Sequence, residues 1–243
     1  MRIIFSRKGF DTGSGGAPSP IIDGRPISLP IPTKRRSSTC YGDLGLGETV
    51  ANVTKGRICA DHLCHEDPMF FDGRCLFGQC GAAQSHLRRQ GVGPGDVLLF
   101  FGLFSEDDGR ERHHRLYGYM RVDSVIEGDG LSAGHPRVAA APRPHPHTIG
   151  EWNANNCLYV GHGRLAGSAD PRLRLTTAGG PLRLWDVPAW LTETGLSYHG
   201  RADRWHDGNR LEIVSRGQEF VADIGDREEP RRWLEDIIGI IAG

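Results

Sequence analysis

One stretch sets the architecture of this chain, the sequence Gly93-Pro94-Gly95-Asp96-Val97-Leu98-Leu99-Phe100-Phe101-Gly102-Leu103-Phe104. Its first four residues are typical of a turn, and the apolar run that follows is typical of a buried strand. A charged loop over residues 105–115 leads to a second apolar run, residues 116–122. The pattern therefore predicts a β-hairpin whose first strand lies in the core.

The chain opens with a short apolar strand, Arg2–Phe5, and a glycine-rich loop, Ser6–Ser19. Glycine tolerates positive φ and has no Cβ, so such a loop can bring backbone N–H groups close to a phosphate or polar ligand. The loop lacks the ending of a P-loop, and it does not pass straight into a helix as a dinucleotide fingerprint does. Two interpretations stay open: a flexible loop, and one wall of a polar pocket that Arg7, Lys8 and Asp11 face.

The remaining elements follow from periodicity and from turn residues. Residues 26–32 are expected to be extended, and residues 128–146 to form an irregular connection. Helices are expected over 47–54, 76–90 and about 229–240, and further strands over 157–162, 173–176, 211–215 and 219–223. The pattern predicts an α+β fold with a strongly bent mixed or antiparallel sheet, or a small barrel, and flanking helices. We find no alternating βαβ pattern and expect no parallel sheet; the whole chain, 1–243, is interpreted as a single domain.

The charge of the chain excludes a protein that coats nucleic acid non-specifically. Its 29 basic and 30 acidic residues give a net charge of -1, whereas such proteins are strongly basic. Any contact with DNA should therefore go through a local patch. The sequence has neither an apolar run of membrane-spanning length nor a signal peptide. We therefore expect no membrane partner, a cytoplasmic location and six reduced cysteines.

Several motifs resemble those of one known family, the third nucleotide-modification-associated domain family, whose opening the first three are similar to. They include Ser6–Asp11, Gly15–Pro20, Ser28–Pro32, Tyr41–Leu44, His65–Pro68, Phe77–Leu87, Gly95–Phe101 and Gly217–Val221. The likeness covers nearly the whole chain. It implies a substrate class, namely a nucleotide, a nucleoside or a nucleic-acid base, and leaves the reaction open.

A second similarity is local. The Gly-Asp start, apolar strand, charged loop and Tyr117-Gly118-Tyr119 of the hairpin look like the core of PUA-like barrels, including the EVE and ASCH groups. Those folds hold RNA or modified DNA bases in a cleft. The similarity implies a barrel core that includes residues 93–127.

Polar residues in and beside the predicted turns are candidates for a site. A helix over 76–90 would place Gln79, Ala83 and His86 on one face. His65 could act as a general base if Asp67 orients it. The candidate catalytic residues are Asp11, Asp43, His65, Asp67 and Glu219, and the candidate substrate-binding residues are Arg7, Lys8, Ser19, Gln79, His86, His199 and Gln218. Asn153, Asn155 and Asn156, beside Trp152, could contact a base or form a plain turn.

The sequence predicts no cofactor. A structural zinc site through Cys59, His62, Cys64, Cys75 and Cys80 is an alternative, although the cysteine spacings are wider than is usual for zinc. The nucleophile elbow, the H-E-x-x-H motif and the zinc-deaminase pattern are all absent.

Two functions remain. One is an enzyme that acts at a base or N-glycosidic bond of a nucleoside, a nucleotide or DNA. The other is a non-catalytic PUA-like reader of a modified base, with aromatic walls from the hairpin and Trp152. Convergence of Arg7, Asp11, His65, Gln79 and Glu219 in a closed pocket would favour the enzyme, and an open aromatic cleft would favour the reader.

Overall fold

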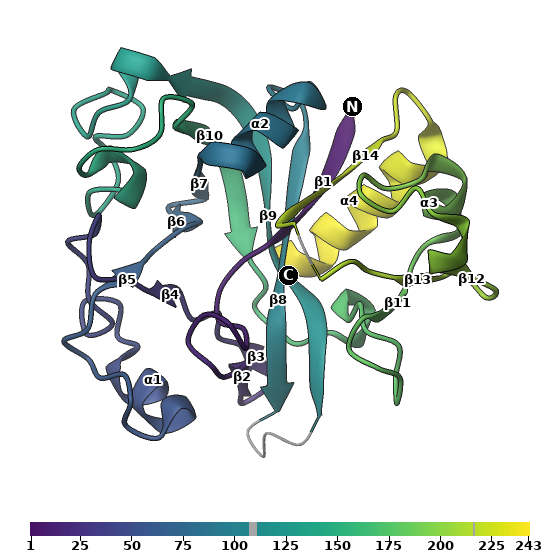
Figure 1. Cartoon of the computed structure of the whole chain (residues 1–243), viewed down its shortest axis with the longest axis horizontal. Helices are drawn as coiled ribbons and strands as arrows, with labels where there is room; N and C mark the ends of the chain where they lie inside the picture. The colour runs from purple at the N-terminus through teal and green to yellow at the C-terminus, as the bar shows by residue number, and fades with distance from the viewer. Residues whose placement is uncertain (107–110, 216) are drawn as a thin grey trace.

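A mixed nine-stranded sheet forms the centre of the fold, which the computed structural model describes over residues 1–106, 111–215 and 217–243 (Figure 1). Its main path runs β14 (Glu219–Asp223), β1 (Arg2–Arg7), β8 (Val97–Glu106), β9 (Arg112–Glu127), β10 (Cys157–Leu165), β7 (Arg74–Gln79) and β6 (Met69–Phe71). Strand β2 (Ser19–Ile22) adds beside β8, and β3 (Arg25–Pro26) pairs with β2.

The fold class is confirmed as α+β, and the sheet is mixed. Both β1 and β2 run parallel to β8, and they lie one after the other along the same edge of it. The connection from β1 to β8 contains six short strands and two helices rather than one crossover helix. The sequence therefore shows no βαβ pattern that would have predicted this parallel pairing. The ends of the main path, β14 and β6, are not paired in the described part of the chain. The sheet is therefore open, and the PUA-like barrel does not form.

Four helices flank the sheet: α1 (Gly47–Thr54), α2 (Gly81–Arg89), α3 (Ala189–Thr194) and α4 (Glu228–Ala242). In Figure 1, α3 and α4 lie to the right of the sheet, and α1 lies at the lower left. Two small sheets complete the structure. One pairs β4 (Ile31–Pro32) with β5 (Cys64–His65), and the other contains β11 (Leu184–Asp186), β13 (Arg210–Glu212) and β12 (Trp205–His206).

The hairpin is the core of the molecule, as predicted. Along β8, Leu99 and Phe101 pack on one face of the sheet with the apolar side of α4, whereas Leu98 and Phe100 pack on the other face with Leu87 of α2. Alternate side chains of a strand point to opposite faces, so a strand buried on both sides has an unbroken apolar sequence. This double burial explains why the run from Val97 to Phe104 contains only apolar residues and one glycine.

Two predicted elements are wrong. The helix predicted over 76–90 is a buried strand, β7, followed by a shorter helix, α2, with Gly81 at φ +63° at the junction. Pairing with β6 and β10 overrides the helical spacing of this stretch. Residues 173–176 form no strand. They end a 3₁₀ turn and make two isolated bridges.

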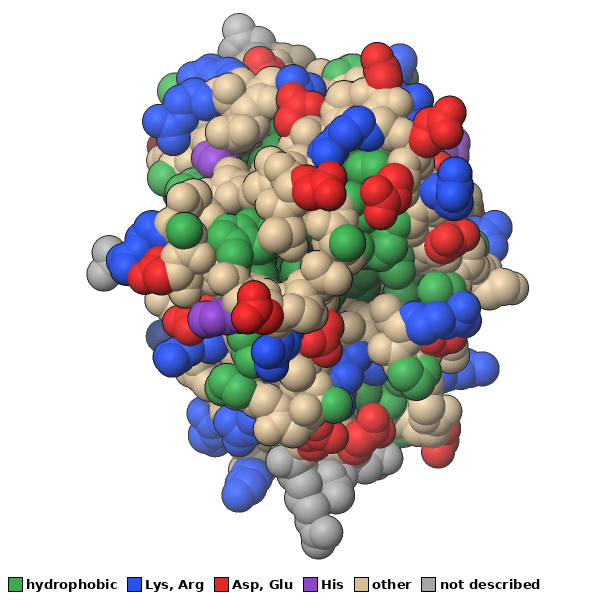
Figure 2. Space-filling view, turned by 90° about the vertical axis from the view of Figure 1, so that its right-hand side faces the viewer, with side chains coloured by type: hydrophobic (Ala, Val, Ile, Leu, Met, Phe, Trp, Pro, Cys, Tyr) green, Lys and Arg blue, Asp and Glu red, His purple; other side chains and the backbone are tan. Residues whose placement is uncertain are grey.

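The surface in Figure 2 carries both signs of charge. Lys and Arg side chains interleave with Asp and Glu side chains over this face, which agrees with the near-zero net charge. Such a face offers no broad cationic field to a nucleic-acid polymer. Among the described residues, no helix is both long enough and apolar enough to cross a membrane.

Candidate functional site

The glycine-rich loop leaves the sheet at the end of β1 and returns to it at β2. Lys8 donates its backbone N–H to the carbonyl of Phe101, and Ser19 pairs with Phe104 further along β8. Between them, Asp11 Oδ1 accepts the backbone N–H groups of Gly13 and Ser14 at 2.7 and 2.6 Å. This Asx turn holds the loop in a defined shape beside the sheet.

Lys8, Gln79 and Glu219 form a buried polar cluster at the junction of three elements. Glu219 begins β14 and is 1% exposed. Its Oε1 accepts hydrogen bonds from Lys8 Nζ and Gln79 Nε2, both at 2.7 Å, whereas its Oε2 is buried and has no partner among the residues that the structure describes. The Lys8 ammonium also lies 4.7 Å from the centre of the Phe77 ring. Ion pairing and the ring together offset part of the cost of burying the ammonium.

Asp67 is the centre of a second cluster, formed with three histidines. Its Oδ1 accepts the N–H of Gly78 at 2.9 Å and lies 3.3 Å from Nε2 of His145. Its Oδ2 lies 3.7 Å from Nε2 of His65 and 3.8 Å from Nε2 of His147. Burial opposes ionisation of Asp67, yet the neighbouring imidazoles of His145, His65 and His147 hold its pKa well below the usual range. The carboxylate is therefore charged at neutral pH.

The hydrogen bonds of His147 show which of its two ring nitrogens carries the proton. Asn156 donates its amide N–H to the His147 carbonyl at 2.9 Å, and its Oδ1 lies 2.6 Å from His147 Nδ1. An amide oxygen can only accept, so Nδ1 carries the proton and Nε2 presents a lone pair. Burial lowers the pKa of His147 to about 4, which keeps the ring neutral.

Both clusters border one cavity of about 490 Å³. Arg7, Asp11, His65, Gln79 and Gln218 are among its lining residues, together with Lys8, Asp67, His147 and Trp152. The Trp152 ring stacks on His147 at 4.1 Å between centres and closes one wall. Three segments that are far apart in the sequence, the glycine-rich loop, the ends of β5 and β7 and the entry to β14, thus meet at a single space.

A second cavity of about 610 Å³ adjoins the first and shares Gln79, Cys80, Gly217 and Gln218 with it. His86 and Tyr198 face each other there, with ring centres 4.3 Å apart. Gln79 and His86 therefore border one space, although the predicted helix does not bring them together. Gln79 ends β7, and His86 lies on α2.

Three sequence candidates lie away from this space and have other contacts. Ser19 Oγ is buried and accepts the N–H of Leu29. His199 uses both ring nitrogens, with the Ser197 carbonyl and the Val214 N–H as partners. Asp43 caps the turn at Cys40 and borders a different cavity of about 430 Å³.

Two of the three histidines of the second cluster, His145 and His147, are the residues that the sequence missed. His145 and His147 fall in and just after the stretch predicted to be irregular, and only their His-Pro-His spacing hinted at a shared role. The asparagines brace the site: Asn156 holds His147, and Asn155 bonds both backbone groups of Gly81 at the start of α2.

The predicted zinc alternative does not assemble in the described residues. Their one group of three potential metal ligands is His65, Asp67 and His147, whose ligand atoms lie within 4.8 Å of one another. Cys59 is exposed, whereas Cys64 and Cys75 are buried in different clusters of the core.

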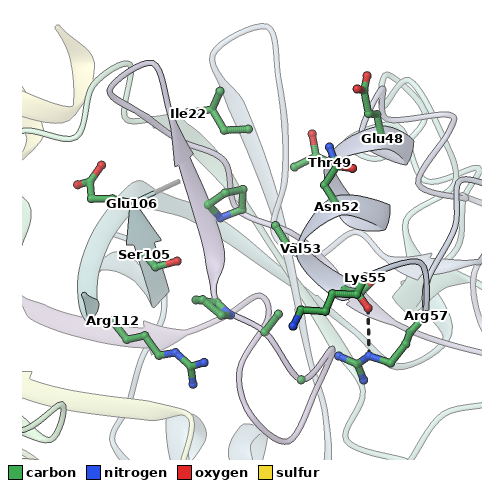
Figure 3. A pocket seen from close by; sticks show the side chains of 15 residues that line it. Ile22, Glu48, Thr49, Asn52, Val53, Lys55, Arg57, Ser105, Glu106 and Arg112 are labelled. Carbon is green, nitrogen blue, oxygen red and sulfur yellow. Dashed lines mark hydrogen bonds between the residues drawn. The ribbon is translucent and has the colours of Figure 1, made fainter. Parts of the chain in front are cut away.

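A larger cavity of about 960 Å³ lies between α1, β2 and the end of β8 (Figure 3). Its charged side chains, Glu48, Lys55, Arg57, Glu106 and Arg112, are spread around the rim and do not point to a common position. Volume alone does not make a reactive site, which needs converging groups. The cavity that Lys8, Gln79 and Asp67 border is the better candidate.

Comparison with known proteins agrees with the resemblance seen in the sequence. Residues 2–223 match the family model described as nucleotide modification associated domain 3. The searches of curated proteins and of solved structures gave no significant match. The family model spans all of the nine-stranded sheet and every residue of both polar clusters. The chain belongs to the nucleotide modification associated domain 3 family.

Proposed function

We propose that this protein is an enzyme that acts at the base or the N-glycosidic bond of a nucleoside, a nucleotide or DNA. One observation carries the proposal: two charged clusters from distant parts of the chain converge on one cavity of about 490 Å³. Buried charge is costly, and a fold that buries two ionic clusters around an open space resembles an active site more than a core. The family supplies the substrate class.

The proposed phosphate end of the cavity lies at Arg7. Its guanidinium contacts the carbonyls of Ser215 and Val214 at 3.2 and 3.4 Å and has no ion-pair partner within salt-bridge distance among the described residues. It could therefore turn toward an anion, to which a guanidinium gives two parallel hydrogen bonds. Lys8 is already paired with Glu219, so we assign the phosphate contact to Arg7 rather than to Lys8.

Glycosidic hydrolysis fits the remaining groups. In that reaction the bond from C1′ to the base nitrogen breaks, water oxygen bonds to C1′, and the base nitrogen takes up a proton. A neutral histidine such as His147 can accept the proton of the water. Glu219 borders the adjoining cavity, and its buried Oε2 has no partner among the described residues; we assign it the negative charge that stabilises a developing oxocarbenium ion.

The reader alternative receives less support. It requires aromatic side chains of the hairpin to wall an open cleft, yet Phe100 is fully buried and Tyr117 is 3% exposed. Both belong to the core between the sheet and α2. Among the described Phe, Tyr and Trp residues, only Trp152 borders the cavity, so stacking surface for a base is limited.

Mass spectrometry of incubated substrates tests the proposal. Separate incubations with nucleosides, nucleotides, single-stranded DNA and duplex DNA should release free base or produce another defined mass change from at least one of them. Asp67→Asn and Glu219→Gln should each lower that rate by about 10²-fold or more, in line with loss of a charge that stabilises a transition state. Arg7→Ala should act mainly on KM for phosphorylated substrates.

A matched control is His162→Gln, because His162 forms an exposed pair with Asp123 on β9, outside both clusters. Its activity should equal that of the wild type. Tight binding with every substrate mass unchanged would refute the enzyme and leave the reader.

A further inference from the structure

In the second cluster, the distances from Asp67 to two of its histidines are too long for hydrogen bonds. They are close to the distance between two ligand atoms of one metal ion. Oδ2 of Asp67 lies 3.7 Å from His65 Nε2 and 3.8 Å from His147 Nε2, beyond the usual range of an N–H···O bond. Two ligand atoms that share a tetrahedral Zn²⁺ at about 2.1 Å are roughly 3.4 Å apart. The pairs would need to close by only a few tenths of an ångström.

The neighbouring residues leave the correct atoms available. Oδ1 of Asp67 is occupied by the Gly78 N–H at 2.9 Å, which leaves Oδ2 for an ion. His147 presents an unprotonated Nε2, because Asn156 accepts from its Nδ1. Metal-binding histidines are usually fixed in this way by a partner on the other ring nitrogen.

His145 adds a second support for the carboxylate. It is fully buried, and its Nδ1 accepts the N–H of His147 at 3.2 Å, so its proton lies on Nε2, toward Asp67 Oδ1. A buried imidazole in this position orients the carboxylate without competing for Oδ2. The fold therefore provides an outer layer around the three candidate ligands.

We propose that His65, Asp67 and His147 bind one divalent first-row transition-metal ion, with Zn²⁺ or Fe²⁺ as the candidates. Two imidazole nitrogens and one carboxylate oxygen suit these ions, whereas Mg²⁺ and Ca²⁺ prefer sites built from oxygen. Three protein ligands leave at least one position open, and here that position faces the cavity of about 490 Å³. Binding stands by itself; its use rests on the proposed function, in which a bound ion would activate the water in place of His147, whose Nε2 it would occupy.

Metal titration of the whole chain tests this proposal without any substrate. After treatment with a chelator and removal of the chelator, calorimetric titration with Zn²⁺ should give one ion bound per chain. Co²⁺, a visible probe for zinc sites, should give ligand-field bands without a thiolate charge-transfer band, because no cysteine is a proposed ligand. Bound Zn²⁺ should also raise Tm, since it binds the folded chain.

Variants identify the ligands. Loss of a residue that only supports a ligand weakens metal binding by roughly 10–100-fold, and Asn156→Ala should weaken Zn²⁺ binding by that amount. His65→Ala removes a proposed ligand and should weaken Zn²⁺ binding further. His65 is partly exposed and lies in the two-residue strand β5, so its variant is the one most apt to keep the fold; circular dichroism melts check this. His162→Gln, which alters an exposed histidine outside the cluster, should bind as the wild type does.

Three results would overturn the metal site: no saturable binding, unchanged affinity in His65→Ala, or a thiolate band with Co²⁺. These outcomes are separable from failure of the proposed function. A bound ion that depends on His65, together with unchanged substrates, would refute the function and keep the site. Substrate turnover by the metal-free protein that binds no ion would keep the function and refute the site.

Discussion

Replacement of Gly78 of β7 by any residue with a Cβ should disturb the candidate site. A Cβ added there would lie 2.8 Å from His147 Nε2 and still closer to Cδ2 and Cγ of the same ring. Ordinary contacts of this kind are about 3.5–4.0 Å, so the ring would have to retreat by roughly 1 Å. His147 cannot do so freely, because Asn156 holds it at 2.6 Å and Trp152 stacks on it.

The expected effects of Gly78→Ala are on both stability and function. Overpacking of a buried site costs about 1–3 kcal/mol, which corresponds to a fall in Tm of roughly 2–12 °C for a chain of this size. A displacement of about 1 Å in a reacting group can reduce the rate about 10²-fold. Urea denaturation, the substrate-mass assay and Zn²⁺ titration measure the three consequences.

A second glycine provides the control. Gly167 has no atom within 4 Å of the position of an added Cβ, so Gly167→Ala should match the wild type in every assay. Truncating the ring removes the clash, and Gly78→Ala should therefore destabilise a His147→Ala background by less than it destabilises the wild type. Equal stability and equal activity of the Gly78 and Gly167 variants would refute the packing argument.

Two further predictions concern buried charge. Lys8→Met should lower the free energy of unfolding by about 3–5 kcal/mol, because it leaves the Glu219 carboxylate buried without its cation. The double variant with Glu219→Gln should be destabilised by less than the sum of the two single variants in urea denaturation. Additive effects would contradict the pairing. Burial lowers the pKa of His113 to about 4 and that of His114 to about 3, so the unfolded chain, with pKa values near 6.5, binds protons first as the pH falls. The free energy of unfolding should therefore decrease from about pH 6.5 toward pH 4, by up to roughly 1.4 kcal/mol per pH unit for each histidine, and a flat profile would argue against buried neutral rings.

Elements whose signals were local could be predicted from the sequence. Helix α1 has the predicted bounds, and α4 begins and ends within two residues of them. The apolar run of β8 and the strand β14 were also recognisable, because burial and turn residues mark them directly. Strand β7 was not, because its identity depends on tertiary pairing, above all with β10, which lies far along the sequence.

The candidate site shows the same division. Arg7, Asp11, His65 and Gln218 could be selected as candidates from their turns and family motifs, but not their convergence; the structure has them lining one cavity. The dependence of Asp67 on His145 and His147 could not be foreseen. Those histidines come from a connection without regular structure, and only the path of the chain after β9 brings them beside β7.

Tryptophan fluorescence tests most directly whether this cavity receives a nucleotide-like ligand. Of the five tryptophans, Trp152 borders the cavity, whereas the other four pack in or against the core beside α4. Titration with nucleosides, nucleotides or short DNA should change the emission saturably, and Trp152→Phe should abolish the change. A saturable change that persists undiminished in Trp152→Phe, or the absence of any change with all of these ligands, would contradict the account.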